Sequence, residues 1–206
     1  ASGTGGAGAT SGPRLAGCRV LPGDNSFNQR IDRLPVARGS APLIARIGLD
    51  APVHPDFGTV YAGAPNGIPI TVVSDPVTRR PARFTYASES DHARYPLPPG
   101  VGIEGGPRGH GDRHVIVLDR STCTDYELYA AYPHAGYWTA GSGAIFPLNS
   151  DRLRPAGWTS ADAAGLPILP GLARYDEVAS GRSDHALRFT VARTQRGFIH
   201  PATHFA

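Results

Sequence analysis

The chain contains 206 residues, of which 40% are hydrophobic and 18% are charged. Its 26 Gly and 20 Pro residues interrupt the sequence too often for a mainly helical fold, and the lack of a three-residue Gly period excludes collagen. All basic residues are Arg and lie scattered, so the net charge of +3 does not predict a nucleic-acid-binding surface. No apolar run reaches the roughly 18 residues of a membrane-spanning helix, so no membrane span is expected.

The beginning of the chain predicts an arm followed by one domain. Residues 1–12 contain only Gly, Ala, Ser and Thr, which bury little apolar surface, and we expect a flexible arm there. Residues 13–206 contain no second low-complexity segment and no internal repeat, so we expect a single β-rich domain. The small-residue start and the lack of Met are typical of a secreted protein whose signal peptide has been removed. We therefore expect an extracellular location.

The two cysteines, Cys18 and Cys123, are too few for a Cys₄ zinc site. In an exported protein the simplest interpretation is one disulfide between them, which closes a long loop in the chain. Two free buried thiols are the alternative.

Helical signals are few. Ser40 predicts the start of a short helix over residues 41–47, because Pro42 is tolerated in a first turn and Gly48 ends the apolar pattern. Two further short turns are expected, at residues 161–164 and 172–178.

Strand signals are more numerous. The clearest pair covers residues 114–119 and 126–132, and the Ser- and Thr-rich connection between them predicts a hairpin. Other strands are expected at residues 70–74, 82–86, 137–139, 144–146, 186–193 and 198–200. Many short strands separated by Gly and Pro favour an all-β fold, a β-sandwich or jelly roll with long loops and one to three short helices.

The sequence contains no P-loop, nucleophile elbow, zincin motif or EF-hand loop, which excludes the enzyme and binding classes that these motifs mark. His110 with His114, and His200 with His204, have the spacing of helical metal ligands. Because both pairs lie in Gly- or Pro-containing stretches, we predict no metal and no cofactor. A metal-dependent enzyme that uses His114 is a third, weaker alternative.

Acidic residues supply the first catalytic candidates. Glu104 lies in a Gly-rich stretch, where a ligand can approach the backbone closely. Side chains alternate between the two faces of a strand, so Glu127 shares one face of its predicted strand with Tyr129. Two carboxylates at a suitable separation perform glycoside hydrolysis, so we expect Glu127 to act with Glu104 or Asp176. The alternatives are an exposed Glu127 paired with an Arg, and a surface turn at Asp176 held by a local ion pair.

Histidines support a second mechanism. His114 and His185 each lie at the start of a predicted strand, a usual place for a general acid or base. Arg188 follows His185 closely and would neutralise the carboxylate of a uronate in a lyase. A hydrogen-bonded histidine at a strand end is the structural alternative.

Aromatic residues are concentrated in the second half of the chain. Aromatic faces stack on sugar rings, although core packing explains most such residues. The expected substrate-binding residues are Tyr129, Trp138, Trp158 and Tyr175.

Four stretches carry a resemblance to known sequences: Gly111–Asp119, Gly157–Pro167, Arg174–Val178 and His185–Thr190. Together they resemble a group of uncharacterised secreted bacterial proteins. The resemblance runs from about Phe27 to the C-terminus and implies export and a single domain. It implies no activity and assigns no catalytic role.

The sequence therefore predicts a secreted carbohydrate-active protein that cleaves a polysaccharide, as a glycoside hydrolase or as a lyase. Its expected partner is an extracellular glycan, and the sequence makes no prediction about its oligomeric state. The alternative is a non-catalytic extracellular module that binds carbohydrate, adheres or assembles.

Overall fold

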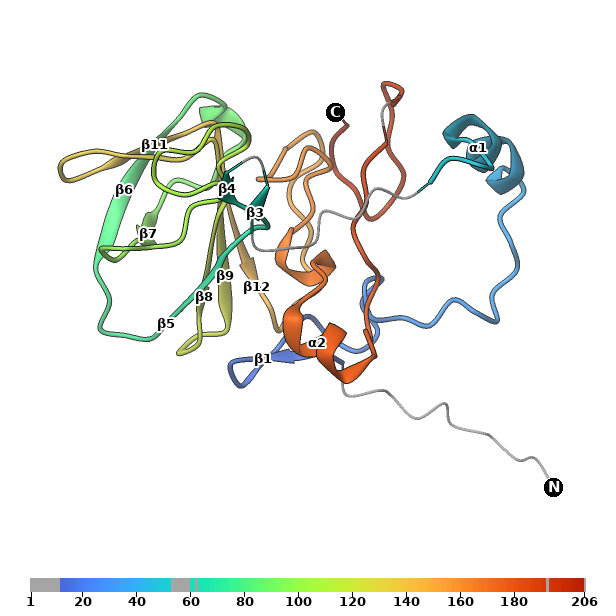
Figure 1. Cartoon of the computed structure of the whole chain (residues 1–206), viewed down its shortest axis with the longest axis horizontal. Coiled ribbons are helices and arrows are strands. Elements are labelled where there is room, and N and C mark those ends of the chain that lie inside the picture. The colour runs from blue at the N-terminus through green and yellow to red at the C-terminus, as the bar shows by residue number, and fades with distance from the viewer. Residues whose placement is uncertain (1–11, 53–59, 62, 192, 206) are drawn as a thin grey trace.

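Two open, four-stranded sheets make up most of the regular structure (Figure 1). The computed structural model describes residues 12–52, 60–61, 63–191 and 193–205. The sheet that we call the central sheet has the order β12-β9-β8-β5. Its strands are β5 (Ile70–Val73), β8 (Val115–Asp119), β9 (Thr124–Tyr129) and β12 (Ser142–Pro147). The other, which we call the outer sheet, has the order β10-β11-β6-β7. Its strands are β6 (Arg79–Phe84), β7 (Arg94–Pro96), β10 (Tyr132–Pro133) and β11 (Trp138–Ala140).

The remaining elements are short. Two small ladders consist of β1 (Arg14–Leu15) with β2 (Cys18–Arg19) and β3 (Val60–Tyr61) with β4 (Ala64–Pro65). The helices are α1 (Ser40–Ile47), α2 (Tyr175–Ser180) and the 3-10 turns η1 (Ala87–Glu89) and η2 (Leu169–Gly171). In the described part of the chain, no helix combines the length and apolar character needed to cross a membrane. The prediction of a β-rich chain with few short helices is confirmed.

The predicted hairpin is formed by β8 and β9, which pair antiparallel with Ile116 opposite Glu127. Two other pairings are parallel: β5 with β8, and β11 with β6. A parallel pair needs a long crossover connection, so each sheet joins segments that lie far apart in the sequence. The predicted strand 126–132 is divided, because Ala130 has a positive φ of 49° and turns the chain after β9.

The two faces of the central sheet are buried against different partners. One face packs on the outer sheet through a cluster that includes Val115, Val117 and Leu128. The opposite face carries Ile116 and Leu118 and packs on residues from an irregular stretch that includes η2. We call residues 154–172 the covering segment, because they close this second face.

The predicted disulfide is present. Cys18 and Cys123 are bonded, with their Cα atoms 5.4 Å apart, and link β2 to the turn between β8 and β9. The disulfide attaches the N-terminal ladder to the same face of the central sheet that the covering segment buries.

The helix predicted after Ser40 is confirmed as α1, which ends at Gly48 with a φ of +114°. Gly39 rather than Ser40 occupies the N-cap position. No residue of α1 is buried, and the helix lies apart from both sheets (Figure 1). The helical turn predicted at residues 172–178 corresponds to α2. Residues 161–164 form a turn held by the Asp162 side chain instead of a helix.

The strands predicted at residues 186–193 and 198–200 are wrong for the described residues. The alternation of Leu187 and Phe189 suggested a strand, but no sheet edge lies beside them and both side chains are exposed. The backbone of this stretch makes isolated contacts instead, such as the bond from the Arg188 N–H to the Gly171 carbonyl. A strand needs a neighbouring strand to satisfy its backbone, and this stretch has none. Of the predicted arm, only Gly12 is among the described residues.

Candidate functional site

A row of three side chains crosses the covered face of the central sheet near one end of its strands. Ser142 of β12 lies opposite Tyr129 of β9, and His114, directly before β8, continues the register beside Tyr129. The covering segment lies across this row. Its Ser160 carbonyl accepts a hydrogen bond from the Ser142 hydroxyl at 2.6 Å, and its Ala161 carbonyl lies 3.2 Å from Nε2 of His114.

Glu104 and His114 form an ion pair at the end of this row. One carboxylate oxygen of Glu104 accepts the backbone N–H of His114 at 3.1 Å and lies 2.7 Å from its Nδ1. Burial opposes ionisation of Glu104, but the hydrogen bonds and charge of His114 outweigh it, so the pKa of Glu104 falls below its usual 4.5. Burial likewise opposes charging of His114, and the Glu104 carboxylate still raises the His114 pKa above 6.5. Both shifts favour a charged pair.

A buried arginine holds the loop that presents Glu104. The Arg113 guanidinium donates to the carbonyls of Gly109 at 2.5 Å and Ala131 at 3.1 Å, and lies over the ring of Tyr132. Gly109 packs so closely on Gly105 that an added Cβ would lie 2.3 Å from the Gly105 oxygen. The Gly-rich sequence therefore permits a tight loop, and Arg113 fixes it.

Arg188 and Asp162 complete what we call the Glu104 cluster: Glu104, His114, Asp162 and Arg188. Nε of Arg188 donates to Asp162 at 2.5 Å, and the Arg188 charge helps to lower the pKa of Glu104. The structure thus brings together three predicted site residues. Asp162 was missed, because the sequence around it suggested a residue at the start of a helical turn.

Glu127 lies behind this cluster in the closed interior. Its side chain is 0% exposed, and one of its oxygens accepts the backbone N–H groups of Ile168 and Leu169 at 2.7 and 2.9 Å. The expectation that Glu127 lines an open face fails because the covering segment occupies that face. Glu127 holds η2 on the sheet.

Asp125 lies on the same face of β9 and is also 0% exposed. Both Asp125 oxygens and the second Glu127 oxygen lack a hydrogen-bond donor among the described groups. Burial and the neighbouring carboxyl raise the pKa of Asp125 well above its usual value, and burial raises that of Glu127. A proton on Asp125 would let this carboxyl group donate to Glu127.

The two remaining predicted catalytic residues, Asp176 and His185, lie around α2. Glu177 accepts a hydrogen bond from Arg174 at 2.6 Å and lies 3.0 Å from Nε2 of His185. Asp176 lies beside them on an open groove of about 330 Å³, which we call the α2 groove. Its lining residues are Gly12, Pro13, Arg14, Arg174, Asp176, Glu177, Ser180, Arg182 and Asp184. Glu177 was not predicted as a site residue, although its neighbour Asp176 was.

The predicted aromatic residues separate into different environments. Tyr175 on α2 is 88% exposed, beside the residues of the α2 groove. Trp138 is buried between the two sheets and cannot present a face to a ligand. Tyr129 packs against the ring of His114, with 5.8 Å between the ring centres.

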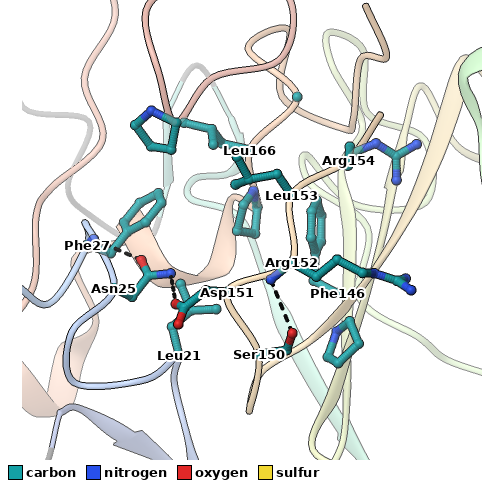
Figure 2. A pocket seen from close by; sticks show the side chains of 14 residues that line it. Leu21, Asn25, Phe27, Phe146, Ser150, Asp151, Arg152, Leu153, Arg154 and Leu166 are labelled. Atoms are coloured by element: carbon teal, nitrogen blue, oxygen red, sulfur yellow. Dashed lines mark hydrogen bonds between the residues drawn. The ribbon is translucent and has the colours of Figure 1, made fainter. Parts of the chain in front are cut away.

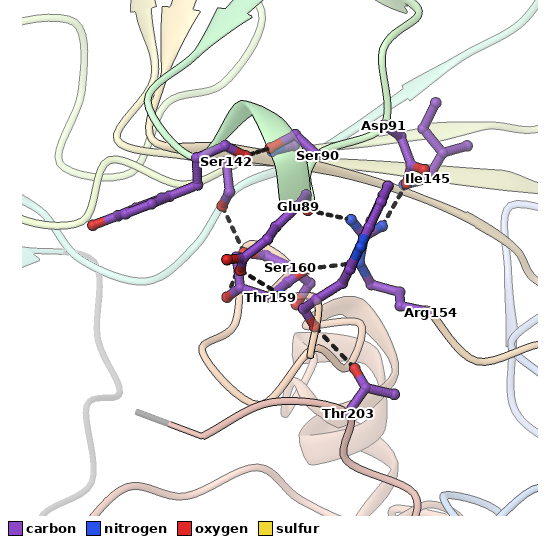
Figure 3. A network of polar contacts seen from close by, with 12 residues as sticks. Glu89, Ser90, Asp91, Ser142, Ile145, Arg154, Thr159, Ser160 and Thr203 are labelled. Carbon is purple, nitrogen blue, oxygen red and sulfur yellow. Dashed lines mark hydrogen bonds and ion pairs between the residues drawn. The ribbon is translucent and has the colours of Figure 1, made fainter. Parts of the chain in front are cut away.

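Arg154 is the centre of a polar network that fastens the covering segment to the sheets (Figure 3), and the predicted residue Trp158 lies against it. The buried Arg154 guanidinium lies over the Trp158 ring, pairs with the Asp91 carboxylate, and donates to the carbonyls of Glu89 at 2.7 Å and Thr159 at 2.6 Å. Each of the three guanidinium nitrogens of Arg154 has a partner within the protein. The network is a structural one.

A narrow cavity lies between the N-terminal segment and the covering segment (Figure 2). Leu21, Phe27, Phe146 and Leu166 give it largely apolar walls. Its volume of about 30 Å³ has room for about one or two water molecules. No predicted catalytic residue lines it, so we do not assign it to a substrate.

The described residues contain no group of three or more His, Cys, Asp or Glu side chains placed to hold a metal ion. His114 contacts Glu104 and a carbonyl, and His204 lies 2.8 Å from the Ala163 carbonyl. Comparisons with protein-family models, with curated proteins and with solved structures each found no match.

Proposed function

We propose that the protein is an extracellular glycan-binding protein and that its ligand lies in the α2 groove. The observation that carries the proposal is a groove of about 330 Å³ that combines cationic, anionic and hydroxyl side chains. The exposed Tyr175 lies between two of its lining residues in the sequence, Arg174 and Asp176. The volume falls within the range of about 300–1,000 Å³ typical of small-ligand sites.

The chemistry of the groove matches a sugar. Sugar hydroxyl groups both donate and accept hydrogen bonds, so a carboxylate such as Asp176 and a guanidinium such as Arg182 can each contact one. The apolar face of a sugar ring stacks on an aromatic ring, and Tyr175 presents one to solvent.

Cleavage of a glycan at the Glu104 cluster is a second candidate. The observation in its favour is that Glu104, His114 and Arg188 lie together. The hydrolase version is weakened, because Glu127 is enclosed and Asp176 lies at the α2 groove, so neither provides an accessible second carboxylate beside Glu104. A lyase version would use His114 as the base and Arg188 as the partner of a substrate carboxylate. It is weakened too, because His114 is buried and Glu104 favours its charged form.

We also propose an extracellular location and a β-sandwich or jelly-roll fold. The Cys18–Cys123 disulfide supports an extracellular protein, since such bonds persist in oxidising compartments. The cluster shared by the two sheets supports a β-sandwich or jelly-roll arrangement. We likewise propose that the chain belongs to the group of secreted bacterial proteins that its sequence resembles.

The test is a binding survey of the purified protein against immobilised neutral and acidic polysaccharides, followed by titration calorimetry with the ligand found. We expect Tyr175→Ala to weaken binding about tenfold, equivalent to about 1.4 kcal/mol. Tyr61→Ala is the matched control, because Tyr61 is another exposed tyrosine, on β3. Failure of the wild type to bind any glycan, or equal loss in both variants, overturns the proposal.

The same polysaccharides distinguish the cleavage candidate. Release of reducing ends indicates hydrolysis, and absorbance from an unsaturated sugar indicates lyase action. Cleavage that Glu104→Gln abolishes and Tyr175→Ala only weakens would move the proposed function to the Glu104 cluster.

A further inference from the structure

Two stretches of the chain carry large apolar side chains that the protein does not bury. One is residues 28–52, which we call the α1 arm, and the other is residues 185–205, which we call the C-terminal segment. In the α1 arm, seven aliphatic side chains between Ile31 and Leu49 are each at least 44% exposed. The C-terminal segment adds four that are each at least 46% exposed: Leu187, Phe189, Phe198 and Ile199. So many large apolar side chains rarely gather on the surface of a soluble protein without a partner to cover them.

The helix of the α1 arm presents its apolar residues together. Leu43, Ile44 and Ile47 follow the helical spacing that brings side chains to one face of α1. No residue of α1 is buried, so this face does not pack on either sheet. Arg46, in the last turn, lies at the border of the same face. The helix is therefore amphipathic, but its apolar face is exposed to solvent.

Both stretches start from the same part of the fold. The backbone N–H of Ala186 donates to the carbonyl of Phe27, directly before the α1 arm, at 2.6 Å. Figure 1 shows α1 and the C-terminal segment on the side of the central sheet that faces away from the outer sheet. One extended partner surface can therefore reach both stretches.

The charge of these stretches differs from that of the rest of the chain. Arginines occur throughout the sequence, but acidic residues are nearly absent here. The α1 arm and the C-terminal segment together contain seven Arg and two Asp, a net charge of +5. All other residues together contain thirteen Arg and fifteen acidic residues, a net charge of −2. The exposed apolar side chains thus coincide with the positive charge of the protein.

Most arginines of the two stretches are exposed. Arg30 pairs with Asp32 at 2.8 Å, and Arg188 pairs with Asp162 at 2.5 Å. The other five residues are exposed to solvent: Arg33, Arg38, Arg46, Arg193 and Arg196. A guanidinium group binds phosphate through several N–H donors at once, so these positions favour an anionic partner.

We infer that the α1 arm and the C-terminal segment together bind the surface of a lipid bilayer that contains anionic lipids. The exposed apolar side chains enter the boundary between headgroups and acyl chains, while the arginines extend to the phosphates above it. Each arginine near such a surface adds electrostatic attraction. The inference goes beyond the proposed glycan binding, and it uses none of the residues that line the α2 groove.

Other partners fit only part of this pattern. A nucleic acid offers phosphates, but it leaves the aliphatic side chains without an apolar environment. A second copy of the chain can cover the apolar side chains, but it brings two positively charged surfaces together. A bilayer offers both negative charge and an apolar interior, and it adapts to side chains that project from a short helix and from irregular stretches.

The first experiment is sedimentation of the wild-type protein with vesicles. The probes are vesicles of phosphatidylcholine alone and vesicles of equal parts phosphatidylcholine and phosphatidylglycerol. We expect binding to the anionic vesicles to be about tenfold or more tighter than to the neutral ones, and the difference to shrink as salt increases. Binding to neither kind of vesicle at low salt overturns the inference.

Variants at exposed positions then test the two kinds of contact separately. Ile44→Gln removes an apolar contact and should weaken binding to anionic vesicles about tenfold. Its matched control is Val178→Gln, an exposed aliphatic position on α2, which should bind like wild type. Arg38→Gln should weaken binding about fivefold, which corresponds to about 1 kcal/mol for one basic residue at the surface. Its control is Arg120→Gln, an exposed position in the turn between β8 and β9.

Two further measurements distinguish the bilayer from other partners. Binding that falls in Arg38→Gln but is unchanged in Ile44→Gln, with equal affinity for the soluble polyanion heparin, overturns the bilayer in favour of a soluble anionic partner. A dimer in sedimentation velocity that Ile44→Gln dissociates, without vesicle binding, overturns it in favour of a second copy. Tyr175→Ala should leave vesicle binding unchanged, so the glycan proposal and this inference succeed or fail separately.

Discussion

A single oxygen of Glu104 accepts both the backbone N–H and the ring N–H of His114, so one carboxylate fixes the start of β8 and the charge of the histidine before it. The contact joins the loop held by Arg113 to the strand that follows. It also makes the pair a local source of pH-dependent stability.

Glu104→Gln should lower the pKa of His114 and destabilise the fold by about 1–3 kcal/mol, the usual effect of removing one partner of a buried polar contact. The raised His114 pKa makes the pair's contribution complete below 6.5, and the contribution is lost as pH rises through the folded pKa. The lowered Glu104 pKa makes the contribution present above 4.5, and it is lost as pH falls through the folded pKa. In urea titrations, the free energy of unfolding of the variant should therefore fall furthest below that of wild type between pH 4.5 and pH 6.5. NMR titration of the His114 ring gives its pKa directly. An unchanged His114 pKa would contradict the pairing.

Asp125→Asn should change how stability depends on pH. Because the folded pKa of Asp125 is raised, its contribution is present below the unfolded value of 3.8 and is lost as pH rises towards the folded pKa. The amide has the shape of the protonated acid and donates to Glu127 without titrating. Between the unfolded and the folded pKa of Asp125, wild type binds a proton when it folds and the variant does not. Over this range the free energy of unfolding of the variant should rise by about 1.4 kcal/mol relative to wild type for each pH unit. Urea midpoints measured from about pH 4 to pH 7 test this, with the exposed Asp24→Asn as the control; parallel curves for wild type and Asp125→Asn would sink the idea.

Replacing Cys18 and Cys123 together by Ser should destabilise the protein by about 4–5 kcal/mol in the chain-entropy model, since the bond closes a separation of 105 residues. The measurement is the urea midpoint of the double variant beside wild type with and without reductant. Reduced wild type should match the double variant. A midpoint independent of both changes would show that the bond adds no stability.

Arg154→Met should cost about 1–3 kcal/mol, because it removes the donors of the Glu89 and Thr159 carbonyls and leaves the partly exposed Asp91 carboxylate without its charged partner. The covering segment should also loosen, and hydrogen exchange should quicken at the Thr159 N–H, which donates to Glu89. Arg152→Met is the control, since Arg152 is exposed close by. Unaltered exchange at Thr159 in the Arg154 variant would mean that the network does not hold the segment.

The parts of the fold that local sequence specifies were predictable. The hairpin of β8 and β9 follows from two apolar strands around a polar turn, and α1 follows from Pro42 and Gly48. Residues 186–200 carry a similar strand pattern, yet a strand depends on a neighbouring edge that the local sequence does not reveal.

The site shows the same division. Glu104 and His114 were predicted, because a Gly-rich loop next to a strand brings polar side chains to a strand end. The enclosure of Glu127 could not be predicted from the sequence. The covering segment that closes over it starts about 27 residues later in the chain, and its sequence has little of the periodicity that marks a helix or a strand. The roles of Asp162 and Glu177 also depend on contacts with distant or irregular residues, Arg188 and His185.

The chain order of the central sheet and the covering segment has a consequence for the covered face of the sheet. All four strands of the sheet precede the segment, so the backbone N–H groups that Glu127 accepts, from Ile168 and Leu169, come from a later part of the chain than the pair of carboxyl groups on β9. Because burial raises the pKa of Asp125 well above its usual 3.8, covering this residue favours its protonated form over the ionised form that an exposed Asp adopts above pH 3.8. Closing this face therefore becomes less favourable as pH rises from 3.8 towards the folded pKa of Asp125, so the burial of this face is coupled to proton concentration through a residue that is fully enclosed in the folded protein.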